Sequence, residues 1–293
     1  MSSGPKVFVI LPVHNRWEQT RRCLGLLAEQ SHGGVRVVLV DDGSTDGTRE
    51  FVKRDFPGVT VLDGDGTLWW AGGVNRGLDF AMRESSPADF LLILNNDLAF
   101  DGNFVAGLFR ESIERGRAAL FPPSVDNRTG EPADTGLIVD WKGVRIVSAH
   151  HWDKEGPLPE PDAVSTRGLL LPVSVVAAAG RLREKELPHY LSDIEYTLRI
   201  KAMGLPLYRS LKVTASLDLG TTGIRVTPGM GSPWREVRDH LFDYRSPSNI
   251  VHWLRFLRIC CPKRYMPRWI LSILVAEMKF AGKAFLRGTG SRA

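Results

Sequence analysis

Two apolar runs in the first hundred residues each end in a group of acidic and amide side chains, and this repeated ending limits the fold more than any other feature. Residues 35–40 lead into Asp-Asp-Gly-Ser at 41–44, and residues 90–94 lead into Asn-Asn-Asp at 95–97. Residues 7–13 form a third apolar run. Amphipathic stretches alternate with these runs, as in parallel strands connected by helices. We therefore predict an α/β fold with a mostly parallel central sheet, whose ligands bind outside the carboxyl ends of the strands.

The amphipathic stretches predict helices flanking this sheet. They cover residues 17–29, 45–54, 72–83 and 194–203. We expect Asn15 to cap the first of them and Gly204 to end the last. Residues 122–165 are rich in Pro, Gly, Asp and Asn, which predicts loops with short strands.

The chain changes character near residue 235, where long helical stretches rich in Trp, Leu, Arg and Ile begin. We therefore expect a main domain over 1–234, made of halves 1–125 and 126–234, and a helical extension over 235–293. A chain of 293 residues that is 43% hydrophobic can bury a full core for such a domain. No signal-peptide pattern precedes the first strand, and three cysteines form neither a disulfide framework nor a zinc pattern. We expect a cytoplasmic protein.

Basic residues crowd the extension, although the net charge of the chain is only +5. They are Arg255, Arg258, Lys263, Arg264, Arg268, Lys279, Lys283, Arg287 and Arg292. Such a basic and apolar segment could bind nucleic acid or an anionic membrane surface. We expect peripheral contact with a membrane and no nucleic acid, with packing on the main domain or a homodimer contact as the alternatives. The apolar stretch over 269–276 is too short to cross a bilayer, which takes about 20 residues.

Two segments of the first half carry side chains and glycines suited to a phosphate-bearing ligand. Asp41 and Asp42, at a strand end, could accept hydrogen bonds from a nucleotide, although Asp-Gly pairs are also ordinary turns. Residues 65–77 hold four glycines beside Trp69 and Trp70. We expect a loop whose backbone amides approach a diphosphate, with a helix N-terminus after Gly73 that favours the anion. The alternative is that the tryptophans fill the core beneath a structural loop.

Two further aspartates suit metal binding and proton transfer. Asp97 ends a buried strand, where a hard carboxylate oxygen could bind Mg²⁺ or Mn²⁺, or could simply form a polar corner. Asp193 lies in the first turn of a predicted helix, where a capping role is the simpler reading. Glu195, two residues on, could do no more than pair with Arg199.

Taken in order, these segments resemble the inverting glycosyltransferases of family 2, which have the GT-A fold. The resemblance covers roughly residues 6–220 and rests on residues 11–16, 40–44, 70–77, 94–97 and 168–172, followed by the Asp193 segment. The Trp69-Trp70 pair and Arg245-Ser246-Pro247 resemble bacterial enzymes that transfer rhamnose or galactofuranose to surface polysaccharides. The resemblance implies a GT-A catalytic domain, with a nucleotide-binding half and an acceptor half, and a helical extension.

Carried over residue by residue, the resemblance implies a role for each motif. Asp193 is the expected general base, and Asp97 is the expected ligand of Mn²⁺ or Mg²⁺. Glu195 and Arg199 are expected to contact the acceptor or to support Asp193. The residues expected at the nucleotide-diphosphate sugar donor are Pro12, Asn15, Asp41, Asp42, Gly43, Trp70, Gly72, Gly73, Asn75 and Asn96.

The sequence departs from the family pattern at two points. Ser192 replaces the glutamate that precedes the base, and residues 216–223 lack the histidine that often serves as a further metal ligand. The expected function is metal-dependent transfer of a sugar, rhamnose being one candidate, to a glycan or lipid-linked acceptor. The alternatives are a nucleotidyltransferase that makes a sugar nucleotide and a non-catalytic module on a membrane surface.

Overall fold

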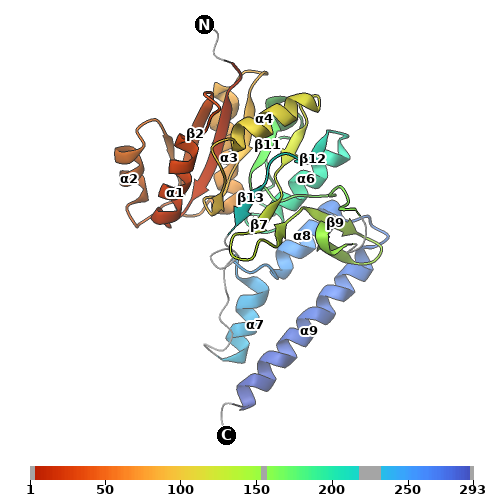
Figure 1. The fold of residues 1–293 in the computed structure, drawn as a ribbon. Helices are drawn as coiled ribbons and strands as arrows, with labels where there is room; N and C mark the ends of the chain where they lie inside the picture. The colour runs from red at the N-terminus through yellow and green to blue at the C-terminus, as the bar shows by residue number, and fades with distance from the viewer. Residues whose placement is uncertain (1–3, 153–156, 218–231, 291–293) are drawn as a thin grey trace.

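A central mixed sheet organises the computed structural model, which describes residues 4–152, 157–217 and 232–290. Within these residues, seven strands pair in the order β12-β6-β11-β4-β1-β2-β3 (Figure 1). They are β1 (Val7–Val13), β2 (Val35–Asp41), β3 (Thr60–Asp63), β4 (Phe90–Ile93), β6 (Ala119–Phe121), β11 (Leu169–Pro172) and β12 (Leu207–Arg209). Every neighbouring pair is parallel except those of β11, which runs antiparallel to β4 and β6.

Helices cover both faces of the sheet. Successive residues of β1 point to opposite faces, and since these residues are apolar, each face must be covered. Val7, Val9 and Leu11 pack in one apolar cluster, and Phe8 and Ile10 pack in another. The first cluster includes residues of α1 (Trp17–Ala28), α2 (Thr48–Asp55) and α4 (Phe104–Glu114). The second includes residues of α3 (Trp69–Glu84), α5 (Val173–Ala179) and α6 (Ser192–Ala202). The predicted α/β class is confirmed.

The short strands predicted among the loops of residues 122–165 are present as β7 to β10, and β5 and β13, from outside this region, join β7 and β8 in one sheet. A four-stranded sheet has the order β5-β13-β7-β8, and β9 and β10 form a separate antiparallel pair. Their bounds are β5 (Leu98–Ala99), β7 (Ser124–Asp126), β8 (Pro132–Asp134), β9 (Leu137–Asp140), β10 (Arg145–Ser148) and β13 (Ala215–Leu217), and a 3₁₀ turn, η1, spans Ala149–His151.

The expected glycine loop over 65–77 is wrong, because α3 begins at Trp69 and encloses most of it. Two of its four glycines serve helix–strand packing instead. A Cβ on Gly73 would lie 3.0 Å from Cβ of Pro12, and one on Gly77 would lie 2.4 Å from Cγ2 of Ile10. Only glycine lets α3 approach β1 this closely.

The cap expected at Asn15 is also wrong. Asn15 has a φ of 58°, and its side-chain oxygen accepts a hydrogen bond from the backbone of Thr45 rather than from α1. Asp46 takes the capping role, because its carboxylate accepts from the N–H groups of Trp17 and Thr48, at the starts of α1 and α2. The second helix therefore begins three residues later than predicted.

Three helices follow the main domain: α7 (Pro233–Phe242), α8 (Ile250–Cys260) and α9 (Met266–Gly290). Phe256 and Leu257 of α8 are fully buried in a cluster with Leu187 and Leu191, so α8 packs on the main domain. The start of α9 also packs on the main domain, because Trp269 lies in this cluster and donates to the carbonyl of Trp141 at 2.9 Å. Beyond it, α9 lies beside α7 and the two project away from the main domain, and we call this pair of helices the arm (Figure 1). The predicted boundary between the main domain and the extension, between residues 234 and 235, stays a prediction. Apolar side chains from both sides of it pack in one cluster.

Candidate active site

Asp97 lies just beyond the carboxyl end of β4, which neighbours β1 at the point where the strand order reverses, the place where ligands bind in such sheets. Its Oδ1 and the Oδ1 of Asn95 are buried without a hydrogen-bond partner among the described residues. Burial raises the pKa of Asp97, against the opposing charges of Arg167 and Arg16. Asn96, between them, donates to the hydroxyl of Thr20 over 3.0 Å. Buried, unpaired oxygens are uncommon in folded proteins and point to a missing ligand.

Asp41 is the last residue of β2 and Asp42 follows it. Both side chains are buried. Oδ1 of Asp42 accepts from the backbone N–H groups of Gly66 at 2.8 Å and Leu68 at 3.2 Å, and its Oδ2 accepts from that of Trp69 at 3.1 Å. Asp42 thus orders the turn before α3. Asp41 accepts from a backbone N–H through Oδ1 at 2.9 Å.

Asp193 stands in the first turn of α6. Its Oδ1 accepts from the N–H of Ile194 at 2.9 Å, and no side chain caps the helix. Burial is the main cause that raises the pKa of Asp193, with a smaller contribution from Asp134, while Arg167 opposes the rise. A carboxylate with a raised pKa is better matched to proton abstraction near neutral pH. The same carboxylate satisfies one N–H of the first turn of α6, so the structural alternative and the role as a base both stay open.

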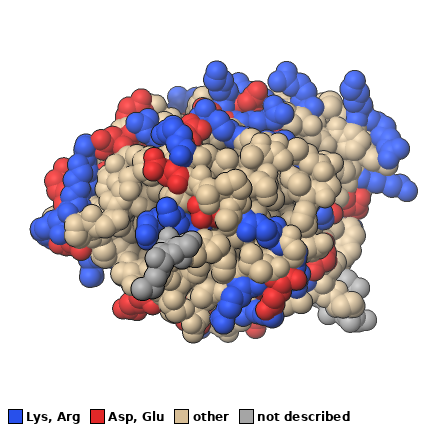
Figure 2. All heavy atoms as spheres, turned by 90° about the horizontal axis from the view of Figure 1, so that it is seen from above, with Lys and Arg blue, Asp and Glu red and all other residues tan. Residues whose placement is uncertain are grey.

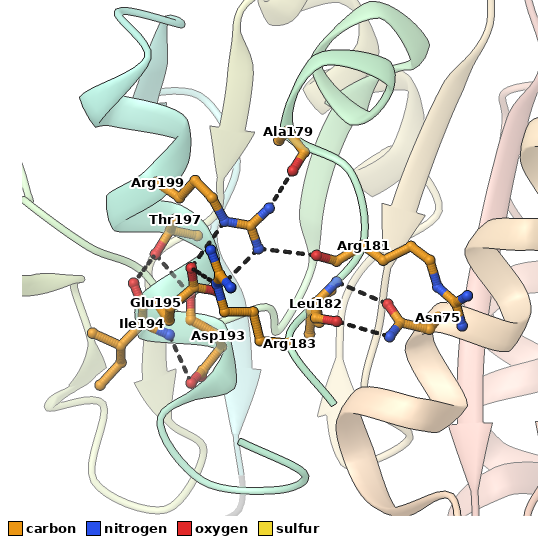
Figure 3. A network of polar contacts seen from close by, with 10 residues as sticks. All are labelled: Asn75, Ala179, Arg181, Leu182, Arg183, Asp193, Ile194, Glu195, Thr197 and Arg199. Atoms are coloured by element: carbon orange, nitrogen blue, oxygen red, sulfur yellow. Dashed lines mark hydrogen bonds and ion pairs between the residues drawn. The ribbon is translucent and has the colours of Figure 1, made fainter. Parts of the chain in front are cut away.

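A buried ion-pair network holds α6 in place (Figure 3). Glu195 is 1% exposed and binds Arg199 through both of its oxygens, at 2.9 and 3.0 Å, and Arg183 at 3.1 Å. Arg199 also donates to the carbonyl groups of Ala179 and Arg181. The pairing of Glu195 with Arg199 is confirmed, and it fixes the helix that carries Asp193.

Arg167 is a functional candidate that the sequence reasoning missed. Its neighbour Thr166 accepts from Nε1 of Trp70 at 3.1 Å, and its other neighbour, Gly168, donates to the carbonyl of Ile93 at 2.9 Å. Arg167 is therefore held between α3 and the end of β4, and its positive charge acts on both Asp97 and Asp193. The acidic residues predicted for the metal and the nucleotide lie at or just after strand ends, whereas Arg167 precedes a strand, β11.

Several expected donor residues have structural contacts. Asn75 is fully buried, and its amide donates to the carbonyl of Leu182 at 3.0 Å and to Glu184 at 2.7 Å and accepts from the N–H of Leu182 at 2.8 Å. Gly43 has a φ of 68°, and a Cβ there would lie 2.9 Å from the nitrogen of Gly66. Gly72 lies inside α3, where a Cβ would meet Leu68 at 3.3 Å.

The two departures from the family pattern have different outcomes. Ser192 is fully buried, and its hydroxyl donates to the carbonyl of His189 at 2.9 Å, so it braces the turn before Asp193. Residues 218–223 of the segment that lacks histidine lie outside the described residues. Elsewhere, the described residues hold no cluster of three His, Cys, Asp or Glu side chains suited to a metal. The unpaired oxygens of Asn95 and Asp97 still fit a hard divalent cation whose other ligands come from a donor phosphate and water.

Comparison with known proteins identifies the family of this chain. Residues 8–158, just over half of it, match the sequence profile of Glycosyl transferase family 2. The chain belongs to this family. A relative, Glycosyltransferase GlyA of Streptococcus pneumoniae serotype 4, is 25% identical over 112 residues, which are 37% of this chain and 15% of that protein. The chain thus spans a small part of this relative's length.

Solved glycosyltransferases share the fold of this family-2 chain at low sequence identity. Mannosyltransferase PcManGT from Pyrobaculum calidifontis, in complex with GDP-Man and Mn²⁺, is 15% identical with a TM-score of 0.56, over 100% of this chain and 77% of that one. TarS of S. aureus, in complex with UDP-GlcNAc, is 16% identical with a TM-score of 0.56, over 94% and 81%. The predicted GT-A fold is confirmed.

Proposed function

We propose that this chain is an inverting glycosyltransferase that moves a sugar from a nucleotide diphosphate to a hydroxyl group. One observation supports the proposal: Asp97 and Asp193, almost a hundred residues apart in sequence, both lie within reach of the charge of Arg167, which opposes the rise in the pKa of each carboxyl group. Family membership and the bound nucleotide sugars of the two solved structures support it.

In the proposed reaction, each of the three side chains has a distinct task. Asp193 removes the proton of the acceptor hydroxyl as its oxygen attacks the anomeric carbon from the face opposite the leaving group. Arg167 faces the negative charge that develops on the departing diphosphate. Asp97, with the side-chain oxygen of Asn95, would hold Mn²⁺ or Mg²⁺, which acts as a Lewis acid on that diphosphate. With Asp97 assigned to the metal, these three side chains supply one base and no general acid, which fits transfer with inversion better than hydrolysis.

The proposed donor contacts lie along the ends of β1, β2 and β4. Pro12, Asp41, Trp70 and Asn96 are partly or fully buried there and remain proposed donor-site residues. We propose rhamnose, carried on a nucleotide diphosphate, as the first sugar to test, and a lipid-linked glycan as the acceptor.

A screen of nucleotide sugars tests the activity directly. A bound donor raises the melting temperature by mass action, so thermal stabilisation with and without Mn²⁺ identifies donors, and donor hydrolysis then measures turnover. Stabilisation by one nucleotide sugar, dependent on Mn²⁺ and followed by release of its nucleoside diphosphate, would support a transferase. Formation of a sugar nucleotide from a nucleoside triphosphate would instead identify a nucleotidyltransferase, and no response to any nucleotide would leave a binding module.

We further propose that the arm rests on the anionic inner face of a membrane. Four large apolar side chains of α9 are exposed at helical spacing: Leu271, Leu274, Val275 and Met278. The helix carries four basic residues and only one acidic residue, Glu277, which pairs with His240 of α7. On the face away from the arm, Lys and Arg side chains are interspersed with Asp and Glu (Figure 2). No helix in the described part of the chain is long and apolar enough to cross a membrane.

Vesicle co-sedimentation of the full chain tests this placement. A basic, apolar helix lies in the interface, and each cation there contributes roughly 1 kcal/mol at most. The double variant L271Q/M278Q should lose binding to phosphatidylglycerol vesicles. The control L211Q, which alters a leucine of the main domain that is 73% exposed, should keep it. Equal vesicle binding by both variants would exclude the arm as the membrane-binding surface. A dimer in wild-type protein that L271Q/M278Q dissociates, without vesicle binding, would assign the apolar stripe to a second copy.

A further inference from the structure

Trp69 gathers aromatic and basic side chains into one surface, which we call the Trp69 wall (Trp69, His189, Tyr244 and Arg245). The ring of Tyr244 stacks on that of Trp69 with centroids 5.5 Å apart and planes 22° apart, and the His189 ring lies at 5.8 Å. The guanidinium of Arg245 lies 5.9 Å from the centre of the Trp69 ring. Tyr244 and Arg245 belong to the segment between α7 and α8, so the extension contributes half of this surface.

Backbone contacts join the Trp69 wall to both sides of the candidate active site. The N–H of Trp69 is bound by Asp42, at the end of β2. The carbonyl of His189 is bound by the hydroxyl of Ser192, the residue before Asp193. The Trp69 wall is therefore held to the residue that precedes the proposed base, and a proposed acceptor that extends away from its reactive hydroxyl could reach it.

The turn that presents Tyr244 and Arg245 is fixed by its own hydrogen bonds. Asp243 accepts from the N–H of Arg245 at 2.7 Å, and the side chain of Asn249 donates to the carbonyl of Asp243 at 3.1 Å. Ser246 and Asn249 are almost fully buried, whereas Tyr244 is 48% exposed and Arg245 is also exposed. The turn thus holds two solvent-facing side chains in place before any ligand arrives, which lowers the entropic cost of binding.

The electrostatic character of the Trp69 wall favours an anion. Arg245 forms no ion pair among the described residues, and Asp243, beside it, binds its backbone N–H instead. Burial, with the charges of His252 and Arg245, lowers the pKa of His189 to about 4, so His189 is neutral at physiological pH. The Nδ1 atom of His189 is buried without a partner in the described part of the chain. A planar guanidinium over an aromatic ring, with its N–H groups unpaired, suits a phosphate.

We propose that the Trp69 wall binds the phosphate group of a phosphate-linked acceptor, with Arg245 as the phosphate ligand. Trp69 and Tyr244 would pack against the adjoining sugar or lipid chain, since aromatic faces bind such apolar surfaces. This inference rests on the proposed function, because it places the acceptor beside Asp193. It also gives the extension a recognition role that is separate from membrane contact by the arm.

Calorimetric titration with farnesyl phosphate tests the inference on the full chain, in the presence of Mn²⁺ and a stabilising nucleoside diphosphate. R245Q removes the charge, R245K keeps it, and R258Q removes the same charge from an exposed position on α8. We expect farnesyl phosphate to bind R245Q at least tenfold more weakly than wild type, R245K to be intermediate, and R258Q to match wild type. Farnesol should bind wild type no better than farnesyl phosphate binds R245Q. Inorganic phosphate, tested as a competitor, shows whether the phosphate alone suffices.

Three results would overturn the inference. R245Q could bind farnesyl phosphate as wild type does, or R258Q could lose as much affinity as R245Q. Alternatively, D97A could weaken this binding while R245Q does not, which would place the probe in the donor site. The proposed function is tested separately, by Mn²⁺-dependent binding of the nucleoside diphosphate to wild-type protein. If that binding persists and R245Q is unchanged toward farnesyl phosphate, only the acceptor inference fails.

Discussion

Replacing Asp193 by Asn should separate its catalytic role from a structural one. The amide keeps the oxygen that accepts from Ile194 at 2.9 Å, and Asp193 forms no ion pair in the described structure that the change would break. Loss of a general base typically costs about two to four orders of magnitude in rate, or roughly 3–5 kcal/mol of transition-state stabilisation. We therefore expect turnover to fall by that factor while the free energy of unfolding changes by less than about 1 kcal/mol.

The raised pKa of Asp193 gives this prediction a sign in pH. Because burial raises the pKa of the folded state above its ordinary value, ionising Asp193 costs stability as the pH rises through that raised value. The stability of D193N relative to wild type should therefore increase from acidic to neutral pH. Over the same window the turnover of wild type should rise as Asp193 ionises, with a midpoint above the usual range for an aspartate.

Melting curves and donor turnover on the same preparations provide the measurement. The control is D55N, because Asp55 is an aspartate outside the site that pairs with Arg54 on α2. D55N should keep wild-type turnover. If D193N stayed within about threefold of wild-type turnover, or if it lost turnover only together with its fold, Asp193 would not be the base.

Three further changes test the donor side and the packing of α3. D97A should abolish transfer and the Mn²⁺-dependence of nucleotide affinity by calorimetry, because Asp97 is the best-placed hard ligand; unchanged metal dependence would contradict this. G77A should lower the free energy of urea unfolding by about 1–3 kcal/mol, because the new methyl meets Ile10, whereas G25A, with open space on α1, should be neutral or stabilising. N75A should cost about 1–3 kcal/mol by leaving the backbone of Leu182 unpaired, and a change near zero would argue against that role.

The strands and most helices could be predicted because their signals are local. Alternating or continuous apolar runs identify β1, β2 and β4, and polar residues that follow them mark the ligand edge. The roles of the glycines in α3 could not be read in the same way. In a sequence, a glycine that makes room for a ligand cannot be told from one that makes room for a strand. Only the structure distinguishes them, because a Cβ on Gly77 would lie 2.4 Å from Cγ2 of Ile10.

Arg167 escaped prediction for a topological reason. Strand direction decides which end of an apolar run lies at the ligand edge, and β11 runs against its neighbours. Its N-terminal end therefore lies beside the carboxyl end of β4, so the residue before the strand, not the one after it, reaches the site. The contacts of Trp69 with Tyr244 and Arg245 were equally hidden, because they join segments about 175 residues apart in sequence.

The burial of α8 bears on how such enzymes can be recombined. Phe256 and Leu257 fill the same cluster as Leu187 and Leu191, only a few residues before Asp193. In a chimera joined after residue 234, a foreign α8 would have to pack against Leu187 and Leu191. A poor match would disturb the turn before the proposed base. Exchange between relatives should therefore succeed only when the segment from Leu187 to α8 moves as one block, so that new acceptor preferences arrive together with the helices that support them.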